Sequence, residues 1–204
     1  MTTSAPDALE RLQDGNRRFI GGPRQLESLA DAARREELAA GQAPFAVILG
    51  CADSRVPAEI VFDQGLGDLF VVRVAGNIAT PTQVGSIEYA VEMLGSRLIV
   101  VLGHSGCGAV QATLDTVRAE SADLSEGLSS LVDHIRPAVE PLLDDDAEIA
   151  AVLPSAVRAN VVTTVAELRR VPALENQIRE HGLEIVGAEY DLKTGVVTFF
   201  DDGP

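Results

Sequence analysis

The sequence has no tryptophan, two cysteines, two methionines and few aromatic residues, which make up 4% of its 204 positions. Two cysteines that form no C-x-x-C pair cannot supply a closed zinc-ribbon type of site. In a cytosolic chain, so few cysteines are more typical of metal ligands or catalytic groups than of a disulfide framework. The positions of these two cysteines therefore matter for the function.

Positive charge is also scarce, because 16 Lys and Arg face 31 Asp and Glu and give a formal net charge of −15. A protein that binds a phosphate backbone normally carries the opposite sign, so we expect no nucleic acid partner. Anionic membrane surfaces are disfavoured for the same reason. No apolar run approaches the length of a membrane span, and the N-terminus lacks the regions of a signal peptide. We therefore expect no membrane association and a cytoplasmic location.

The pattern of apolar runs predicts an α/β fold. An apolar content of 46% over 204 residues is enough for one domain, residues 1–204, with a sizeable core. Strands are expected at 45–50, 69–74, 98–102, 184–190 and 196–200, the last two forming a hairpin at the sheet edge. Two helices, 7–20 and 26–40, form an N-terminal helical arm over about residues 6–40.

Further helices are expected between the strands, at 57–62, 81–94, 107–117, 128–143, 155–170 and 172–181. Pro57 and Pro81 fit the first helical position, whereas Pro137 and Pro141 are expected to interrupt their helix. The alternation of strands and helices is typical of three layers, with a mainly parallel central sheet and flanking helices. Continuous apolar strands such as 45–50 suit the middle of such a sheet.

Reactive side chains follow two of these strands. Cys51 comes directly after strand 45–50, and His104 and Cys107 lie in a glycine-rich turn after strand 98–102. Ligands bind at the carboxyl ends of parallel strands, where these three side chains converge if the strands are neighbours. Two thiolates and an imidazole leave a fourth zinc position open, as in catalytic sites. Each turn alone fits a buried cysteine or a hydrogen-bonded histidine equally well, but two such turns favour a metal.

Asp53 and Arg55 lie two residues apart in the turn after Cys51. They fit a local surface ion pair, which contributes little to stability. They also fit a pair beside the metal, in which the Asp53 carboxylate accepts a hydrogen bond from a zinc-bound hydroxide and Arg55 keeps that carboxylate ionised and aimed. An Asp53 that moved onto the metal would fill the open position and switch the site off.

The two turns, 51–55 and 103–108, together resemble the β-class carbonic anhydrases. The resemblance extends over nearly the whole chain, through the segments 12–19, 62–73, 85–90, 160–161 and 187–192. It implies an α/β sheet decorated by helices, assembled as a homodimer or homotetramer with the active site at the subunit interface. It also implies that the N-terminal helix packs on the neighbouring chain.

The resemblance implies a role for each residue of the two turns. One Zn²⁺ per chain would be held by Cys51, His104 and Cys107, with Asp53 and Arg55 as the catalytic dyad. The family's substrate pocket maps onto Gln42, Phe70, Tyr89 and Gly108. An allosterically inhibited subgroup has a tryptophan where this chain has Ile48, so regulation by bicarbonate in that form is not expected, although Arg73 matches the arginine of that second site.

The implied reaction is the reversible hydration of carbon dioxide to bicarbonate and a proton by attack of zinc-bound hydroxide. A hydrolase of carbonyl sulfide or carbon disulfide would use the same zinc site. A non-catalytic zinc or redox-sensing module is less favoured, because Asp53, Arg55 and Gln42 would then have no purpose. Zinc deaminases also use His/Cys/Cys ligands, but they need a C-x-x-C pair, which this chain lacks.

Overall fold

The computed structural model of the protein describes residues 2–23, 31–119, 123–144 and 148–200. These residues form a sheet with the strand order β2-β1-β3-β4-β5. The strands are β1 (Ala46–Gly50), β2 (Leu69–Arg73), β3 (Leu98–His104), β4 (Glu184–Tyr190) and β5 (Val197–Phe200). The first four are parallel, and β5 pairs antiparallel with β4 at the edge. The predicted mainly parallel sheet with an edge hairpin is confirmed.

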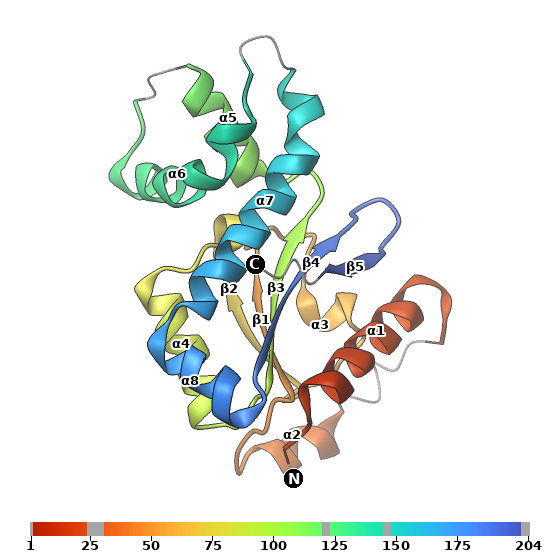
Figure 1. The fold of residues 1–204 in the computed structure, drawn as a ribbon. Coiled ribbons are helices and arrows are strands. Elements are labelled where there is room, and N and C mark those ends of the chain that lie inside the picture. The colour runs from red at the N-terminus through yellow and green to blue at the C-terminus, as the bar shows by residue number, and fades with distance from the viewer. Residues whose placement is uncertain (1, 24–30, 120–122, 145–147, 201–204) are drawn as a thin grey trace.

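Helices cover both faces of the sheet (Figure 1). On one face, α1 (Ala5–Gly21) and α3 (Ala58–Val61) pack with α2 (Ala32–Leu38) nearby. The other face carries α4 (Pro81–Glu92), α7 (Ile149–Arg169) and α8 (Pro172–His181). Beyond the carboxyl ends of the strands lie α5 (Gly108–Arg118), α6 (Glu126–Val139) and the 3-10 turn Glu140–Leu142. The predicted three-layer α/β architecture is therefore confirmed.

The strands β1 and β3 are buried along their entire length, as their continuous apolar sequences predict. Alternate side chains of these strands enter two separate cores. Ile48 and Val100 belong to the core under α1 and α3, while Leu49 and Val101 belong to the core under α4 and α7. A third apolar cluster, which includes Cys51 and Cys107, lies among α5, α6 and the first half of α7.

The N-terminal helix α1 packs on its own chain. Its buried residues include Leu12 and Gly15, and the helix contacts α3 and β3. The Asn16 side chain donates to Gly195 O at 2.9 Å and accepts from Val197 N at 2.9 Å, so it ties α1 to the C-terminal hairpin. The expected packing of this helix on a neighbouring chain stays a prediction.

Several helix limits differ from the predicted ones. In the expected helix 26–40, α2 covers Ala32–Leu38, and positions 24–30 lie outside the described residues. Pro57 precedes α3 as its N-cap residue, whereas Pro81 is at the start of α4 as predicted. Pro137 lies inside α6, which continues to Val139, so it does not interrupt the helix.

The helix α7 begins at Ile149 and includes Pro154, whereas the sequence predicted a start near residue 155. It is long and apolar enough to cross a membrane by length and composition alone. That finding differs from the expectation that no segment reaches such a length. Val157, Val161, Val165 and Leu168 of this helix are buried in the cores described above, and α7 contacts β3 and β4. One face of α7 is therefore packed on the sheet, and 33% of its apolar window is buried.

Candidate active site

The two turns that the sequence singles out meet at the carboxyl ends of the parallel strands. Strands β1 and β3 are neighbours, with Gly50 opposite Leu102, so their carboxyl ends lie side by side. Cys51 follows β1 directly, His104 is the last residue of β3, and Cys107 is the N-cap residue of α5. The sheet thus places the three side chains together although Cys107 follows Cys51 by 56 positions in the sequence.

The three side chains form a compact and buried cluster. The Sγ atoms of Cys51 and Cys107 are 4.0 Å apart, and these two atoms and a ring nitrogen of His104 all lie within 4.8 Å of one another. The exposed fractions are 4% for Cys51, 0% for His104 and 1% for Cys107. A tetrahedral zinc with bonds of about 2.3 Å to sulfur separates two sulfur ligands by about 3.8 Å. The spacing of the sulfurs therefore fits such a metal ion.

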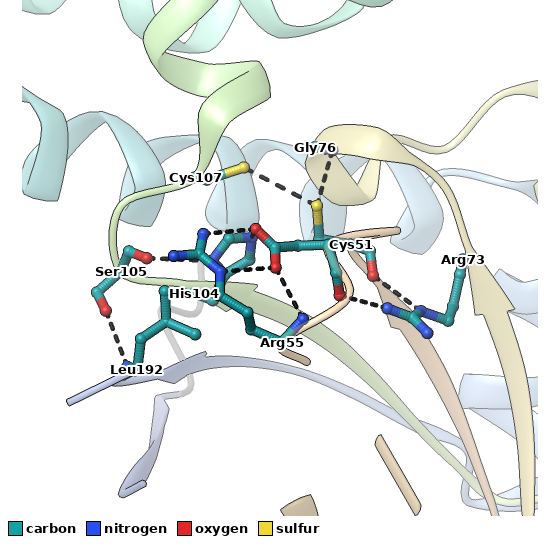
Figure 2. Close-up of polar contacts among 9 residues, drawn as sticks. Cys51, Arg55, Arg73, Gly76, His104, Ser105, Cys107 and Leu192 are labelled. Carbon is teal, nitrogen blue, oxygen red and sulfur yellow. Dashed lines mark hydrogen bonds and ion pairs between the residues drawn. The ribbon is translucent and has the colours of Figure 1, made fainter. Parts of the chain in front are cut away.

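The imidazole of His104 is oriented as a metal ligand. Its Nδ1 lies 3.1 Å from Ser105 O, a carbonyl that can only accept a hydrogen bond, so we assign the ring proton to Nδ1 (Figure 2). The Nε2 atom then carries a free lone pair, and it is buried without a hydrogen-bond partner among the residues that the structure describes. An unpaired buried acceptor is costly unless it binds something. A metal ion between Nε2 and the two sulfurs would satisfy it.

The two thiols share one proton through their contact. The hydrogen bond with Cys107 is the largest cause that lowers the pKa of Cys51 to about 4, against the effect of burial. The same contact, together with burial, raises the pKa of Cys107. The Gly76 N–H also donates to Cys51 Sγ at 3.4 Å and favours the thiolate at that position. Because a metal needs both sulfurs as thiolates, its binding would release the shared proton.

Asp53 and Arg55 form a close ion pair at the rim of this cluster. The Arg55 Nε donates to Asp53 Oδ1 at 2.9 Å and its Nη2 to Oδ2 at 2.6 Å, a bidentate contact. The Arg55 N–H donates to the same Oδ1 at 2.9 Å. Hydrogen bonds from Arg55 are the main cause that holds the pKa of Asp53 well below its usual range. Asp53 Oδ2 lies 3.9 Å from His104 Nε2, and Asp53 is not among the three residues whose ligand atoms lie within 4.8 Å of one another.

Two further polar residues support the site from outside. Arg73, at the end of β2, donates to Cys51 O and Asp53 O, as Figure 2 shows. The buried Asn160 of α7 donates to Gly76 O at 2.8 Å, and the same Gly76 donates to Cys51 Sγ. The sequence analysis assigned neither of these contacts. Each reaches a backbone carbonyl, and carbonyls are present at every residue, so no local sequence pattern identifies the partner.

Some of the residues expected in the substrate pocket do not lie at the carboxyl ends of the strands. Gly108 is the first residue of α5 and adjoins Cys107. Gln42 precedes β1 and is exposed at the amino ends of the strands. The five residues of β1, which span about 16 Å at about 3.3 Å each, separate it from Cys51. Phe70 lies opposite Val47, well before the end of β2, and its ring is 6.3 Å from that of Tyr89. Within one chain, therefore, Gln42, Phe70 and Tyr89 lie away from the metal position.

Comparison with known families agrees with this geometry. The family model described as carbonic anhydrase matches residues 46–197, which include both turns. Carbonic anhydrase 2 of Mycobacterium tuberculosis is 43% identical over 194 residues, which cover 95% of this chain and 91% of that protein. A carbonic anhydrase of Pseudomonas aeruginosa is 35% identical, and the match covers 81% of this chain and 77% of its own.

Solved structures define the class within that family. The β-carbonic anhydrase CcaA has a TM-score of 0.74 at 29% identity, with 95% of each chain covered. A tetrameric β-carbonic anhydrase of Sordaria macrospora has a TM-score of 0.73 at 29% identity, with 83% of this chain and 87% of that chain covered. The fold and the site thus define a carbonic anhydrase. The chain belongs to the β class of that family, which confirms the resemblance found in the sequence.

Proposed function

We propose that the chain catalyses the reversible, zinc-dependent hydration of carbon dioxide, with Cys51, His104 and Cys107 as the zinc ligands. The observation that carries the proposal is the buried Nε2 of His104, which has no hydrogen-bond partner among the described residues and lies beside two sulfurs 4.0 Å apart in a chain of the carbonic anhydrase family. Zinc bound there would lower the pKa of a coordinated water, so that hydroxide is available near neutral pH.

Asp53 acts as the acceptor that aims the nucleophile. Its carboxylate is anionic because Arg55 holds the pKa low, and an anionic carboxylate can only accept hydrogen bonds. If zinc held a hydroxide beside it, Oδ2 could accept a hydrogen bond from that group and so orient its lone pair toward the substrate. Two thiolate ligands donate more charge to zinc than imidazoles do, which makes this contribution of Asp53 more important.

Arg55 fixes the carboxylate of Asp53. A bidentate pair with two short contacts sets both the position and the plane of the acceptor. The side chain of Arg55 is 58% exposed, so the pair contributes little to folding stability. Its value lies in orientation, and this favours the catalytic role over the surface ion pair that the sequence also allowed.

We further propose that the active site is completed by a second copy of the chain in a homodimer or a tetramer. Gln42, Phe70 and Tyr89 cannot reach the metal position of their own chain, because they lie before or along the strands rather than at their carboxyl ends. Tyr89 is 50% exposed and Met93, one turn later on α4, is 71% exposed. Such an apolar surface beside the edge strand β2 is suited to burial against a partner.

The test is Asp53→Asn, measured by stopped-flow hydration of carbon dioxide at pH 7 and pH 8.5 on protein of known zinc content. We expect turnover to fall by at least about 100-fold, as for loss of a group that orients the nucleophile, with about one zinc per chain retained. Asp14→Asn is the matched control, because Asp14 also forms an ion pair with an arginine of its own segment but lies exposed on α1. Normal turnover in Asp53→Asn would contradict this role. A zinc-loaded wild-type protein without hydration at either pH would contradict the proposed reaction and direct the assays to carbonyl sulfide and carbon disulfide.

A further inference from the structure

Arg73 connects the edge of the sheet to the turn that carries both Cys51 and Asp53. It is the last residue of β2, opposite Gly50 of β1. Its Nε donates to Cys51 O at 2.9 Å and its Nη2 to Asp53 O at 2.6 Å (Figure 2). One guanidinium therefore holds the backbone of a proposed zinc ligand and that of the proposed catalytic carboxylate.

These contacts begin where the backbone pairing of the two strands ends. Val74 N donates to Gly50 O and Ala52 N to Val74 O, both at 3.1 Å, and these bonds continue the β1–β2 ladder by one step. The chain then turns away from β2. Beyond this point the Arg73 side chain, instead of backbone pairing, holds the turn to β2. Its hydrogen bonds are charge-assisted and therefore stronger than those of a neutral donor.

The guanidinium is directed at carbonyls rather than at an acid. Among the described parts of the chain, no carboxylate oxygen lies within ion-pair distance of Arg73, whereas Arg55 is paired with Asp53. Arg55 belongs to the same turn as Asp53, so this pair moves with the turn. Only a residue from another element can fix the turn relative to His104 and Cys107, which β3 and α5 hold. Arg73 is such a residue.

We propose that Arg73 is a positioning residue of the catalytic dyad. By holding Cys51 O and Asp53 O, it keeps the Asp53 carboxylate at its place beside the metal position. The proposal rests on the function proposed above for Asp53. Displacement of a catalytic group by about 1 Å can cost about 100-fold in rate, so two hydrogen bonds to the backbone of the turn are enough to matter.

The experiment compares Arg73→Ala, Arg73→Lys and Arg97→Ala, each with Asp53 intact and in the Asp53→Asn background. Arg97 is the matched control, because its Nη1 also donates to two backbone carbonyls, Val91 O and Ser96 O. It precedes β3 and so lies at the amino ends of the strands, away from the metal position. Turnover, zinc per chain and the visible absorption of the cobalt(II)-substituted protein are measured for each variant. The cobalt spectrum reports the surroundings of the metal independently of activity.

We expect Arg73→Ala to lower turnover about 10- to 100-fold while it retains about one zinc per chain. Its cobalt spectrum should differ from that of the wild type, because Cys51 O loses a donor. In the Asp53→Asn background the same change should lower turnover little further, because the effect of Arg73 on the rate acts through Asp53. Arg73→Lys should recover part of the rate, since an ammonium group reaches one carbonyl but lacks the fork for two. Arg97→Ala should keep wild-type turnover. If Arg73→Ala does not fold, Arg73→Lys serves for the same comparison, with a smaller loss of rate.

Wild-type turnover in Arg73→Ala, loss of its zinc, or an equal fold-loss of turnover in the Asp53→Asn background would each overturn the proposal. An active Asp53→Asn variant would instead contradict the proposed function. A wild-type-like Arg73→Ala beside an inactive Asp53→Asn contradicts only the role of Arg73, so the two failures are distinguishable.

Discussion

Ser105 shows how much of the site depends on contacts one residue away from a ligand. Its carbonyl accepts from His104 Nδ1, its N–H donates to Tyr190 O at 3.0 Å, and its hydroxyl accepts from Leu192 N at 3.0 Å. The last two contacts fix the turn after β3 to β4 and to the turn that follows it. The orientation of the histidine, which leaves Nε2 free for a metal, is thus held by the C-terminal part of the chain.

Asn160 also supports the site, although it is not a proposed zinc ligand. We expect Asn160→Leu to lower zinc affinity by about 10- to 100-fold, as for other residues that orient a metal ligand. The buried Gly76 carbonyl would lose its donor, and the Gly76 N–H that reaches Cys51 Sγ would lose its fixed direction. Competition with a chromogenic chelator measures the affinity.

Thr164→Val is the control for that change. Thr164 is buried one turn further along α7, and its hydroxyl donates to Asn160 O of the same helix. It should keep the wild-type zinc affinity. Equal affinities in Asn160→Leu and the wild type would show that Gly76 needs no support from α7.

At the scale of elements, the position of α1 depends on a close contact between Gly15 and the backbone of Phe62, at the end of α3. A Cβ built at Gly15 would lie 1.7 Å from Phe62 O, which is backbone and cannot rotate away. We expect Gly15→Ala to lower the free energy of unfolding by about 1–3 kcal/mol or more, the usual range for an overpacked contact. Urea unfolding followed by circular dichroism measures the change.

Gly21→Ala is the matched control within the same helix, because a Cβ at Gly21 meets no atom within 4 Å. It should be neutral or stabilise the protein by up to about 1 kcal/mol, since alanine loses less backbone freedom on folding. Equal stabilities of the two variants would mean that α1 shifts freely on the sheet, and would contradict the close packing described above.

Some elements of the fold could be predicted from the sequence, and others could not. Strands β1 and β3 were predictable because their apolar runs are continuous, and the rule for carboxyl ends then placed Cys51 and His104 together. The start of α7 at Ile149 was not, because the helix passes through Pro154, a residue type that is usually confined to the first turn of a helix. Prolines near the end of a helix cost little when the carbonyl that loses its partner can face water. The supports of the site, Arg73 and Asn160, were not assigned because their partners are carbonyls from distant segments.

At the scale of the whole molecule, the position of Gln42 decides how many chains make one active site. The sequence resemblance placed Gln42 in the pocket, while the sheet separates it from Cys51 by the length of β1. Both statements hold if the glutamine serves the site of a partner chain. A symmetric dimer would then contain two sites, each with the metal cluster of one chain and Gln42 of the other.

Mixing two inactive variants tests this arrangement directly. Asp53→Asn and Gln42→Ala would each impair both sites of their own dimer, but a mixed dimer would have one site with both changes and one site with none. After unfolding and refolding together in equal amounts, about half of the dimers are mixed and about a quarter of the sites are intact. We therefore expect about a quarter of wild-type hydration, well above the activity of either parent alone. Refolding each variant separately and mixing afterwards, without exchange of chains, is the control and should give no gain. If co-refolding also gives no gain while native mass spectrometry shows mixed dimers, each active site is made by one chain, and Gln42 acts at its own end of the sheet.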